Sequence, residues 1–202
     1  MSARIVLFDL GHVVVDWQPI RLYRDLFDSE AEAQVFVRDI CNMEWHVEHD
    51  RGVSMADNAK PLIAKYPHYE TQIKAWYTRW LDMFEGYVPG MPPLMARLEE
   101  ARVPLYGLSN IPAETAQMTF DAFPMIKLLR DVIVSGAEKT IKPERKIYEI
   151  ALARMGDPDP GDVLFADDRE KNCHAAEALG IKAHHFQGAA GFETRLKAEG
   201  LL

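Results

Sequence analysis

The chain has 202 residues, enough for one domain with a sizeable insertion or for two small domains. Its hydrophobic fraction of 48% and charged fraction of 27% are typical of a globular protein. The net charge of -8, with no basic stretch, argues against a nucleic-acid partner. No apolar run approaches the roughly 20 residues that span a bilayer. The two cysteines, Cys41 and Cys173, indicate neither a disulfide scaffold nor a zinc site. We expect a soluble, cytoplasmic protein that does not bind to membranes.

Short apolar runs recur along the chain and predict β-strands. They cover residues 4–8, 103–108, 132–134, 163–166 and 181–186. Between the later runs lie helical patterns at residues 144–155 and 172–179, and Gly180 is suited to end the second helix. Strands that alternate with helices form parallel sheets whose strands are buried on both faces. The sequence therefore predicts an α/β core.

Residues 16–85 have a different pattern, with several helical segments and no strand-like run. Ser29 and Glu32 form a capping box before a helix that reaches Cys41. Residues 69–84 carry apolar side chains at helical spacing. Glycines and prolines from residue 86 onward mark the return to the core. We predict an all-helical cap at residues 16–85, inserted after the first strand of a core made of residues 1–15 and 86–202.

All four tryptophans fall in this insertion or at its start: Trp17, Trp45, Trp76 and Trp80. They either form the hydrophobic core of the helical segment, which we favour, or line a substrate pocket.

Polar side chains follow the predicted strands at the edge where ligands bind to parallel sheets. The residues at these strand ends are Asp9, Ser109 with Asn110, Lys142 shortly after the third run, and Asp167 with Asp168. Carboxylate oxygens suit a hard divalent cation, and a lysine neutralises phosphoryl oxygens. The sequence predicts a shared cation and phosphate site at this edge.

The order and spacing of four segments resemble the motifs of the haloacid dehalogenase superfamily. The segments are FDLGHVVVDW, LSN, KPERKIYEIAL and FADDREKN, and the resemblance covers nearly the whole chain. Within the superfamily, they look most like the glucose-1-phosphatase-like and epoxide-hydrolase-N-terminal-like branch. The resemblance implies a Rossmann-like core with helices on both faces of the sheet and a C1-type helical cap.

The resemblance also implies roles for the acidic residues. Asp9 matches the nucleophile, which attacks phosphorus to form an acyl phosphate. Gly11 matches a position whose backbone carbonyl binds magnesium, and Asp9 is a further ligand. Asp168 matches a direct magnesium ligand, and Asp167 is expected in the outer shell or to act through water.

The remaining matched positions are expected to hold the phosphate. Ser109 matches the hydroxyl that binds the transferring group. Asn110 and the amides that follow it lie where a helix is predicted to start, with Pro112 in its first turn, which favours an anion. Lys142 matches the lysine that bridges nucleophile and phosphate; Lys139 is its rival, but Pro143 favours Lys142.

One position departs from the pattern of the superfamily's phosphatases. They commonly carry a second aspartate two residues after the nucleophile, as general acid and then base, and here that position is Gly11. Without a substitute the rate would fall by roughly 10²–10⁴. We consider His12, His46 and His49 as replacements.

Three functions are compatible with these residues. The favoured one is hydrolysis of a small phosphorylated metabolite, such as a sugar phosphate. The second is a 2-haloacid dehalogenase, which uses the same aspartate without a metal. The third is a binding or regulatory protein that has lost turnover, for which Gly11 is the only support. Whether the protein is a monomer or a homodimer stays open.

Overall fold

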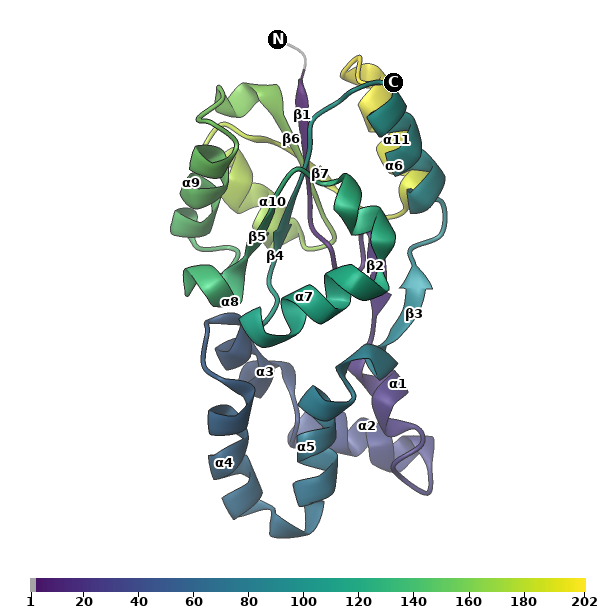
Figure 1. Ribbon diagram of the computed structural model, residues 1–202, viewed down its shortest axis with the longest axis vertical. Helices are drawn as coiled ribbons and strands as arrows, with labels where there is room; N and C mark the ends of the chain where they lie inside the picture. Colours follow the sequence, from purple (N-terminus) through teal and green to yellow (C-terminus); the bar gives the residue numbers. More distant parts are fainter. Residues whose placement is uncertain (1–2) are drawn as a thin grey trace.

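A five-stranded parallel sheet forms the centre of the molecule, in a computed structural model that describes residues 3–202 (Figure 1). The strand order is β5-β4-β1-β6-β7, and β1 pairs with β4 on one side and β6 on the other. The strands are β1 (Ile5–Phe8), β4 (Leu105–Ser109), β5 (Val132–Val134), β6 (Val163–Asp167) and β7 (Lys182–His185). The predicted parallel α/β core is confirmed.

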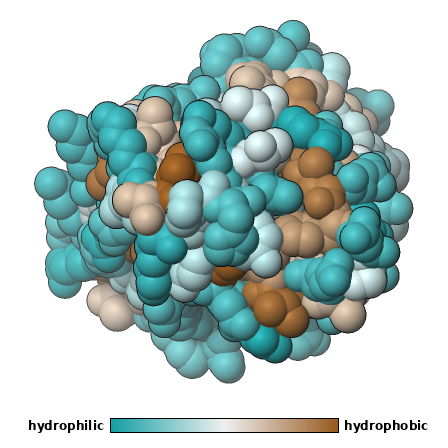
Figure 2. All heavy atoms as spheres, turned by 90° about the horizontal axis from the view of Figure 1, so that it is seen from below, coloured by the Kyte–Doolittle hydropathy of each residue, from teal (hydrophilic) through white to brown (hydrophobic). Residues whose placement is uncertain are grey.

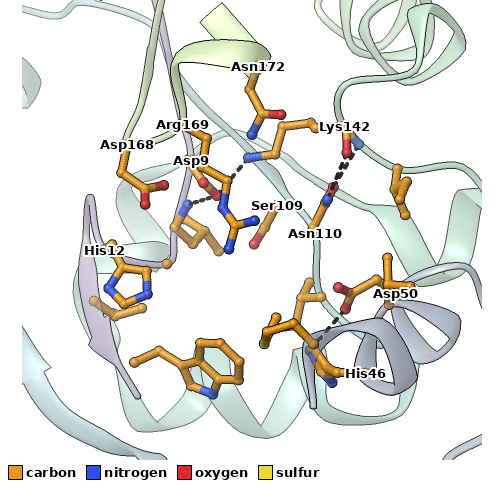
Figure 3. Close-up of a pocket in the computed structure, with 18 of the residues that line it drawn as sticks. Asp9, His12, His46, Asp50, Ser109, Asn110, Lys142, Asp168, Arg169 and Asn172 are labelled. Atoms are coloured by element: carbon orange, nitrogen blue, oxygen red, sulfur yellow. Dashed lines mark hydrogen bonds and ion pairs between the residues drawn. The ribbon is translucent and has the colours of Figure 1, made fainter. Parts of the chain in front are cut away.

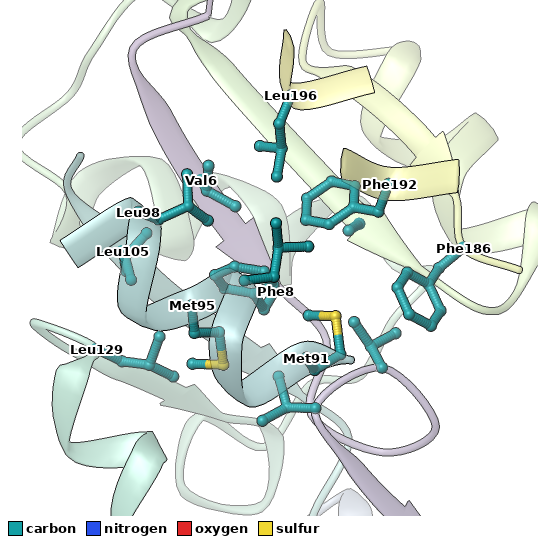
Figure 4. Close-up of a cluster of buried hydrophobic side chains, with 14 of the residues drawn as sticks. Val6, Phe8, Met91, Met95, Leu98, Leu105, Leu129, Phe186, Phe192 and Leu196 are labelled. Atoms are coloured by element: carbon teal, nitrogen blue, oxygen red, sulfur yellow. The ribbon is translucent and has the colours of Figure 1, made fainter. Parts of the chain in front are cut away.

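Helices cover both faces of this sheet. α6 (Met91–Glu100) and α11 (Ala189–Ala198) lie on one face, and α9 (Arg145–Arg154) and α10 (Glu170–Glu177) lie on the other (Figure 1). Because side chains alternate along a strand, β1 contributes to both layers. Val6 and Phe8 pack with α6 and α11 (Figure 4), while Leu7 packs with α9 and α10. The two buried layers hold β1 in the middle of the sheet, and Asp9 is the residue that follows it.

The long segment after β1 forms helices that lie together beyond the carboxyl end of the sheet (Figure 1). They are α1 (Pro19–Tyr23), α2 (Glu30–Asp39), α3 (Met43–Asp50), α4 (Met55–Lys65) and α5 (Glu70–Thr78), with 3-10 helices η1 (Pro67–Tyr69) and η2 (Trp80–Met83). The N-cap half of the predicted capping box is present, since the Ser29 hydroxyl accepts a hydrogen bond from the Glu32 amide at 3.3 Å. We call residues 16–85 the cap segment.

Two strands at the ends of the cap segment were not expected from its sequence. β2 (Val15–Trp17) and β3 (Phe84–Tyr87) pair antiparallel, so the prediction that residues 16–85 contain no strand is wrong. The predicted helix at residues 69–84 likewise ends at Thr78 and continues through η2 into β3. Both strands are short, and their pairing joins segments far apart in the chain, so no local pattern indicates them. The predicted domain boundaries fall inside this ribbon, and the division into core and cap stays a prediction.

The tryptophans divide between a hydrophobic core and the wall of a cavity. Trp76 is fully buried among the cap helices, with its ring centroid 5.3 Å from that of Trp45. Trp17 and Trp80 border this cluster and also line the cavity described below. The cap segment therefore has its own apolar core, one edge of which faces the sheet.

The surface at the cap end is mostly hydrophilic, and its hydrophobic side chains occur in separate groups (Figure 2). Among the helices of residues 3–202, none combines the length and the apolar character needed to cross a bilayer.

The remaining core helices flank the carboxyl ends of β4 and β5. They are α7 (Ala113–Ala122) and α8 (Ser135–Glu138), with 3-10 helices η3 (Pro124–Leu128) and η4 (Pro160–Asp162) elsewhere in the core.

Candidate active site

A cavity of about 480 Å³ lies between the carboxyl ends of the central strands and the cap segment. Asp9, Ser109, Lys142 and Asp168 line it from the core, as do Gly11 and Asn110. From the cap segment, α3, β2 and η2 contribute the opposite wall (Figure 3). The strand ends that the sequence predicted to lie together therefore do so, and the cap segment forms a second wall opposite them.

Lys142 is the central cation of the site. Its Nζ lies 2.8 Å from an oxygen of Asp9 and 2.8 Å from an oxygen of Asp167, and it also donates to the Leu108 carbonyl. Only 2% of Lys142 is exposed. Its sequence rival, Lys139, is exposed and does not line the cavity. Lys142 therefore binds two carboxylates that are themselves buried.

Burial controls the ionisation of these groups. It raises the pKa of Asp9 to about 8; Lys142 opposes this rise, and the nearby Asp167 and Asp168 add to it. Burial alone would lower the pKa of Lys142, but Asp167 and Asp9 together hold it above its ordinary value. Lys142 is thus charged at neutral pH, and additional positive charge near Asp9 would favour its carboxylate form.

Three carboxylates form a group suited to a cation. Asp9, Asp167 and Asp168 each offer an oxygen, and these oxygens lie within 4.8 Å of one another. Asp167 is the most constrained of them: one oxygen accepts from the Arg169 amide and the other from Lys142, and the Asn172 amide group donates to both. Asp9 and Asp168 line the cavity, whereas Asp167 does not. This arrangement favours Asp9 and Asp168 for direct contact with a cation.

The end of β4 places a hydroxyl and an amide in the cavity. Ser109 is the last residue of the strand and is buried at the cavity wall. The side chain of Asn110 forms two hydrogen bonds with the Lys142 backbone, accepting from its amide at 2.8 Å and donating to its carbonyl at 3.1 Å. Asn110 therefore fixes the segment that carries Lys142.

The backbone after Asn110 differs from what the sequence suggested. α7 begins at Ala113, and Pro112 precedes it as the N-cap residue and is not in its first turn. The Ile111 amide donates to the Ser135 hydroxyl at 3.0 Å, and Pro112 has no amide hydrogen. The expectation that amides following Asn110 receive an anion is therefore wrong for these two positions, because a buried serine occupies the first donor.

Gly11 leaves unfilled space beside Asp9. A Cβ atom built there would meet no heavy atom within 4 Å, so crowding does not explain the missing side chain. His12, the next residue, adopts the left-handed backbone region and lines the cavity (Figure 3).

The two cap histidines are poor proton donors. Burial lowers the pKa of His46 to about 3 and that of His49 to about 4. Both rings are therefore neutral at pH 7. His49 does not line the cavity, whereas His46 does.

Sequence reasoning missed three residues of the site: Asp50, Arg169 and Asn172. Arg169 and Asn172 follow Asp168 within FADDREKN, and Asn172 lies one helical turn beyond it, a spacing that could have indicated contact. Asp50 lies four residues after His46 on α3, the spacing of neighbours on one helix face. That signal is weak, because nothing in the sequence shows that this face meets the cavity.

Comparison with known proteins agrees with this arrangement. The model of the haloacid dehalogenase-like hydrolase family matches residues 3–180. A curated relative, the sesquiterpene phosphatase astK of Aspergillus oryzae, is 25% identical over 187 residues, which cover 91% of this chain and 89% of that protein.

Solved structures resemble the whole chain. A predicted HAD-like family hydrolase from Porphyromonas gingivalis superimposes with a TM-score of 0.76 at 20% identity, covering 98% of each chain. The HAD family enzyme bt-2542 of Bacteroides thetaiotaomicron, in complex with magnesium and inorganic phosphate, superimposes with a TM-score of 0.72 at 20% identity. The match covers 93% of this chain and 96% of that one.

Proposed function

Because this chain belongs to the haloacid dehalogenase-like hydrolases, we propose that it is a magnesium-dependent phosphomonoester hydrolase with Asp9 as its nucleophile. One observation carries the proposal: Asp9 lies at the end of the central strand, in contact with Lys142 and next to two further carboxylates, at the wall of a cavity. That combination suits transfer of a phosphoryl group to a carboxylate.

The reaction has two halves. An oxygen of Asp9 attacks phosphorus, the bond to the alcohol oxygen breaks, and an acyl phosphate forms on Asp9. Water then attacks this phosphoryl group and releases phosphate. Lys142 and Ser109 are placed to hold phosphoryl oxygens, and the charge of Lys142 favours the reactive carboxylate form of Asp9.

The donor set fits magnesium. Asp9 and Asp168, with the carbonyl of Gly11, would supply hard oxygen ligands, and Asp167 would support them from the outer shell. When bound, the ion would offset the negative charge of the carboxylates and phosphoryl oxygens. The similar enzyme bt-2542 was crystallised with magnesium and phosphate, and astK is a phosphatase, which supports both parts of the proposal.

The substrate is a small phosphorylated metabolite. A cavity of about 480 Å³ holds a compact molecule, of which a sugar phosphate is one example. Part of the cavity wall is aromatic, because the cap segment contributes Trp17, Trp80 and Phe84, the last of them from β3. These aromatic walls favour an alcohol with exposed carbon faces over a highly charged one.

Removing the metal tests this function. We expect EDTA to abolish phosphate release from a panel of phosphorylated metabolites and magnesium to restore it, since the carboxylates would otherwise repel the phosphate. Phosphate release and halide release from a 2-haloacid are measured in parallel. Halide release that EDTA leaves unchanged, without phosphate release, would identify a dehalogenase instead.

A further inference from the structure

Two residues after Asp9, Gly11 offers no side chain that could act as a general acid, and this inference rests on the proposed phosphatase function. An alcohol leaves phosphorus as an unstable alkoxide unless a general acid protonates it. Gly11 cannot supply that proton, and His46 and His49 are neutral because they are buried. The remaining candidates are His12, which also lines the cavity beside the strand end, and any ionisable group on the opposite wall, where a leaving alcohol would lie.

Asp50 is such a group. It is the last residue of α3, only 5% exposed, and lines the cavity. Among residues 3–202, its Oδ1 atom has no hydrogen-bond partner. Figure 3 shows Asp50 and His46 across the cavity from Asp9, with the carboxyl group of Asp50 turned toward the strand end that carries Asn110. Asp50 is therefore a buried carboxyl group at the cavity wall, with one oxygen that makes no hydrogen bond.

His46 is the neighbour of this oxygen. The Trp76 indole N–H donates to His46 Nδ1 at 3.2 Å, so Nδ1 is an acceptor and the neutral ring carries its hydrogen on Nε2. That Nε2 lies 3.5 Å from Asp50 Oδ1. A small approach would let it donate to Asp50 once the carboxyl group has lost its proton.

The surroundings favour a protonated Asp50 before reaction. Burial raises the pKa of Asp50 to about 7, while Lys142 and Arg169 on the core side oppose the rise. His46 does not take up a second proton in competition, because burial, His49 and Arg169 lower its pKa. The pair therefore holds one exchangeable proton near neutral pH, on the carboxyl group.

We propose that Asp50 is the general acid, and then the general base, of this site, with His46 as a positioning residue. As Asp9 forms its bond to phosphorus and the phosphorus–oxygen ester bond breaks, the Asp50 proton passes to the departing alcohol oxygen. The Asp50 carboxylate, facing His46 Nε2–H, then takes a proton from the water that attacks the phosphoryl group. This step restores protonated Asp50 and frees Asp9 and phosphate. The cap segment thus supplies the acid that the core lacks at Gly11.

The test compares leaving groups in the Asp50→Asn variant with magnesium present. Cyclohexyl phosphate needs protonation of its alcohol, whereas 4-nitrophenyl phosphate releases a stable anion; neither carries another hydroxyl. We compare the rate constants for release of the alcohol in a single turnover, before hydrolysis of the acyl phosphate, because that later step is the same for both esters. We expect this rate constant to fall by roughly 10²–10⁴ for cyclohexanol and to stay close to wild type for 4-nitrophenolate. An equal fall for both esters, or no fall for either, would overturn the proposal.

Three controls keep the result interpretable. Glu48→Gln changes an exposed carboxylate on the same helix and should leave both esters unaffected. Asp50→Glu retains a carboxyl group and should recover part of the cyclohexyl activity. Wild-type protein should itself hydrolyse the two esters at similar rates; a steep preference for the nitrophenyl ester would contradict an acid without relying on any variant. If wild type hydrolyses neither ester nor any phosphorylated metabolite, the proposed function fails, and this proposal with it.

Discussion

Replacing Asp9 by asparagine is expected to lower the rate of phosphate release by a factor on the order of 10⁴ or more, as for other enzymes that lose their nucleophile. An amide oxygen does not form the acyl phosphate, while the side chain keeps its shape. It can still accept the Leu10 amide, which donates to Asp9 at 2.7 Å. The fold should therefore persist, and kcat with saturating magnesium measures the loss.

A matched variant separates chemistry from charge. Asp121 is an exposed aspartate on α7 and does not line the cavity, so Asp121→Asn should keep wild-type turnover. Thermal unfolding shows whether each variant is folded. A folded Asp9→Asn protein with turnover near wild type would exclude Asp9 as the nucleophile.

Replacing Lys142 by methionine is the second change with a large expected effect. It removes the cation whose Nζ lies 2.8 Å from Asp9 and 2.8 Å from Asp167. Both buried carboxylates then lose their ion pair with Lys142. Removing one partner of a buried ion pair costs about 3–5 kcal/mol of unfolding free energy. The pKa of Asp9, already raised by burial, would rise further, so fewer molecules would carry the reactive carboxylate. We expect lower stability in EDTA, measured by urea unfolding, together with lost turnover.

Lys139→Met is the control for this experiment, because Lys139 is close in the chain but exposed. It should change neither quantity appreciably. Equal effects of the two substitutions would show that the ion pairs of Lys142 do not contribute as described.

The core of the fold is predictable from the sequence because its signals are local. Each buried strand is a short apolar run, and residues such as Ile147 and Ala151 mark the buried face of α9 by their spacing. The β2–β3 ribbon is not predictable in this way. Its strands are short, and its stability depends on a partner at the other end of the cap segment.

The residues of the site, like the elements of the fold, are predictable from the sequence only where the signal is local. Asp9, Ser109 and Asp168 are found from the sequence because strand ends of a parallel sheet meet at one edge. Asp50 is not, because its chemistry depends on how α3 docks over that edge. Its burial and its neighbour His46 become visible only in three dimensions.

Trapping the phosphorylated protein tests the central claim most directly. The protein is mixed with magnesium and its best substrate, quenched in acid during turnover, digested and analysed by mass spectrometry. We predict one phosphoryl group on the peptide that contains Asp9, absent from Asp9→Asn. A phosphoryl group on another residue, or none in wild-type protein that accumulates an intermediate by burst kinetics, would contradict the account.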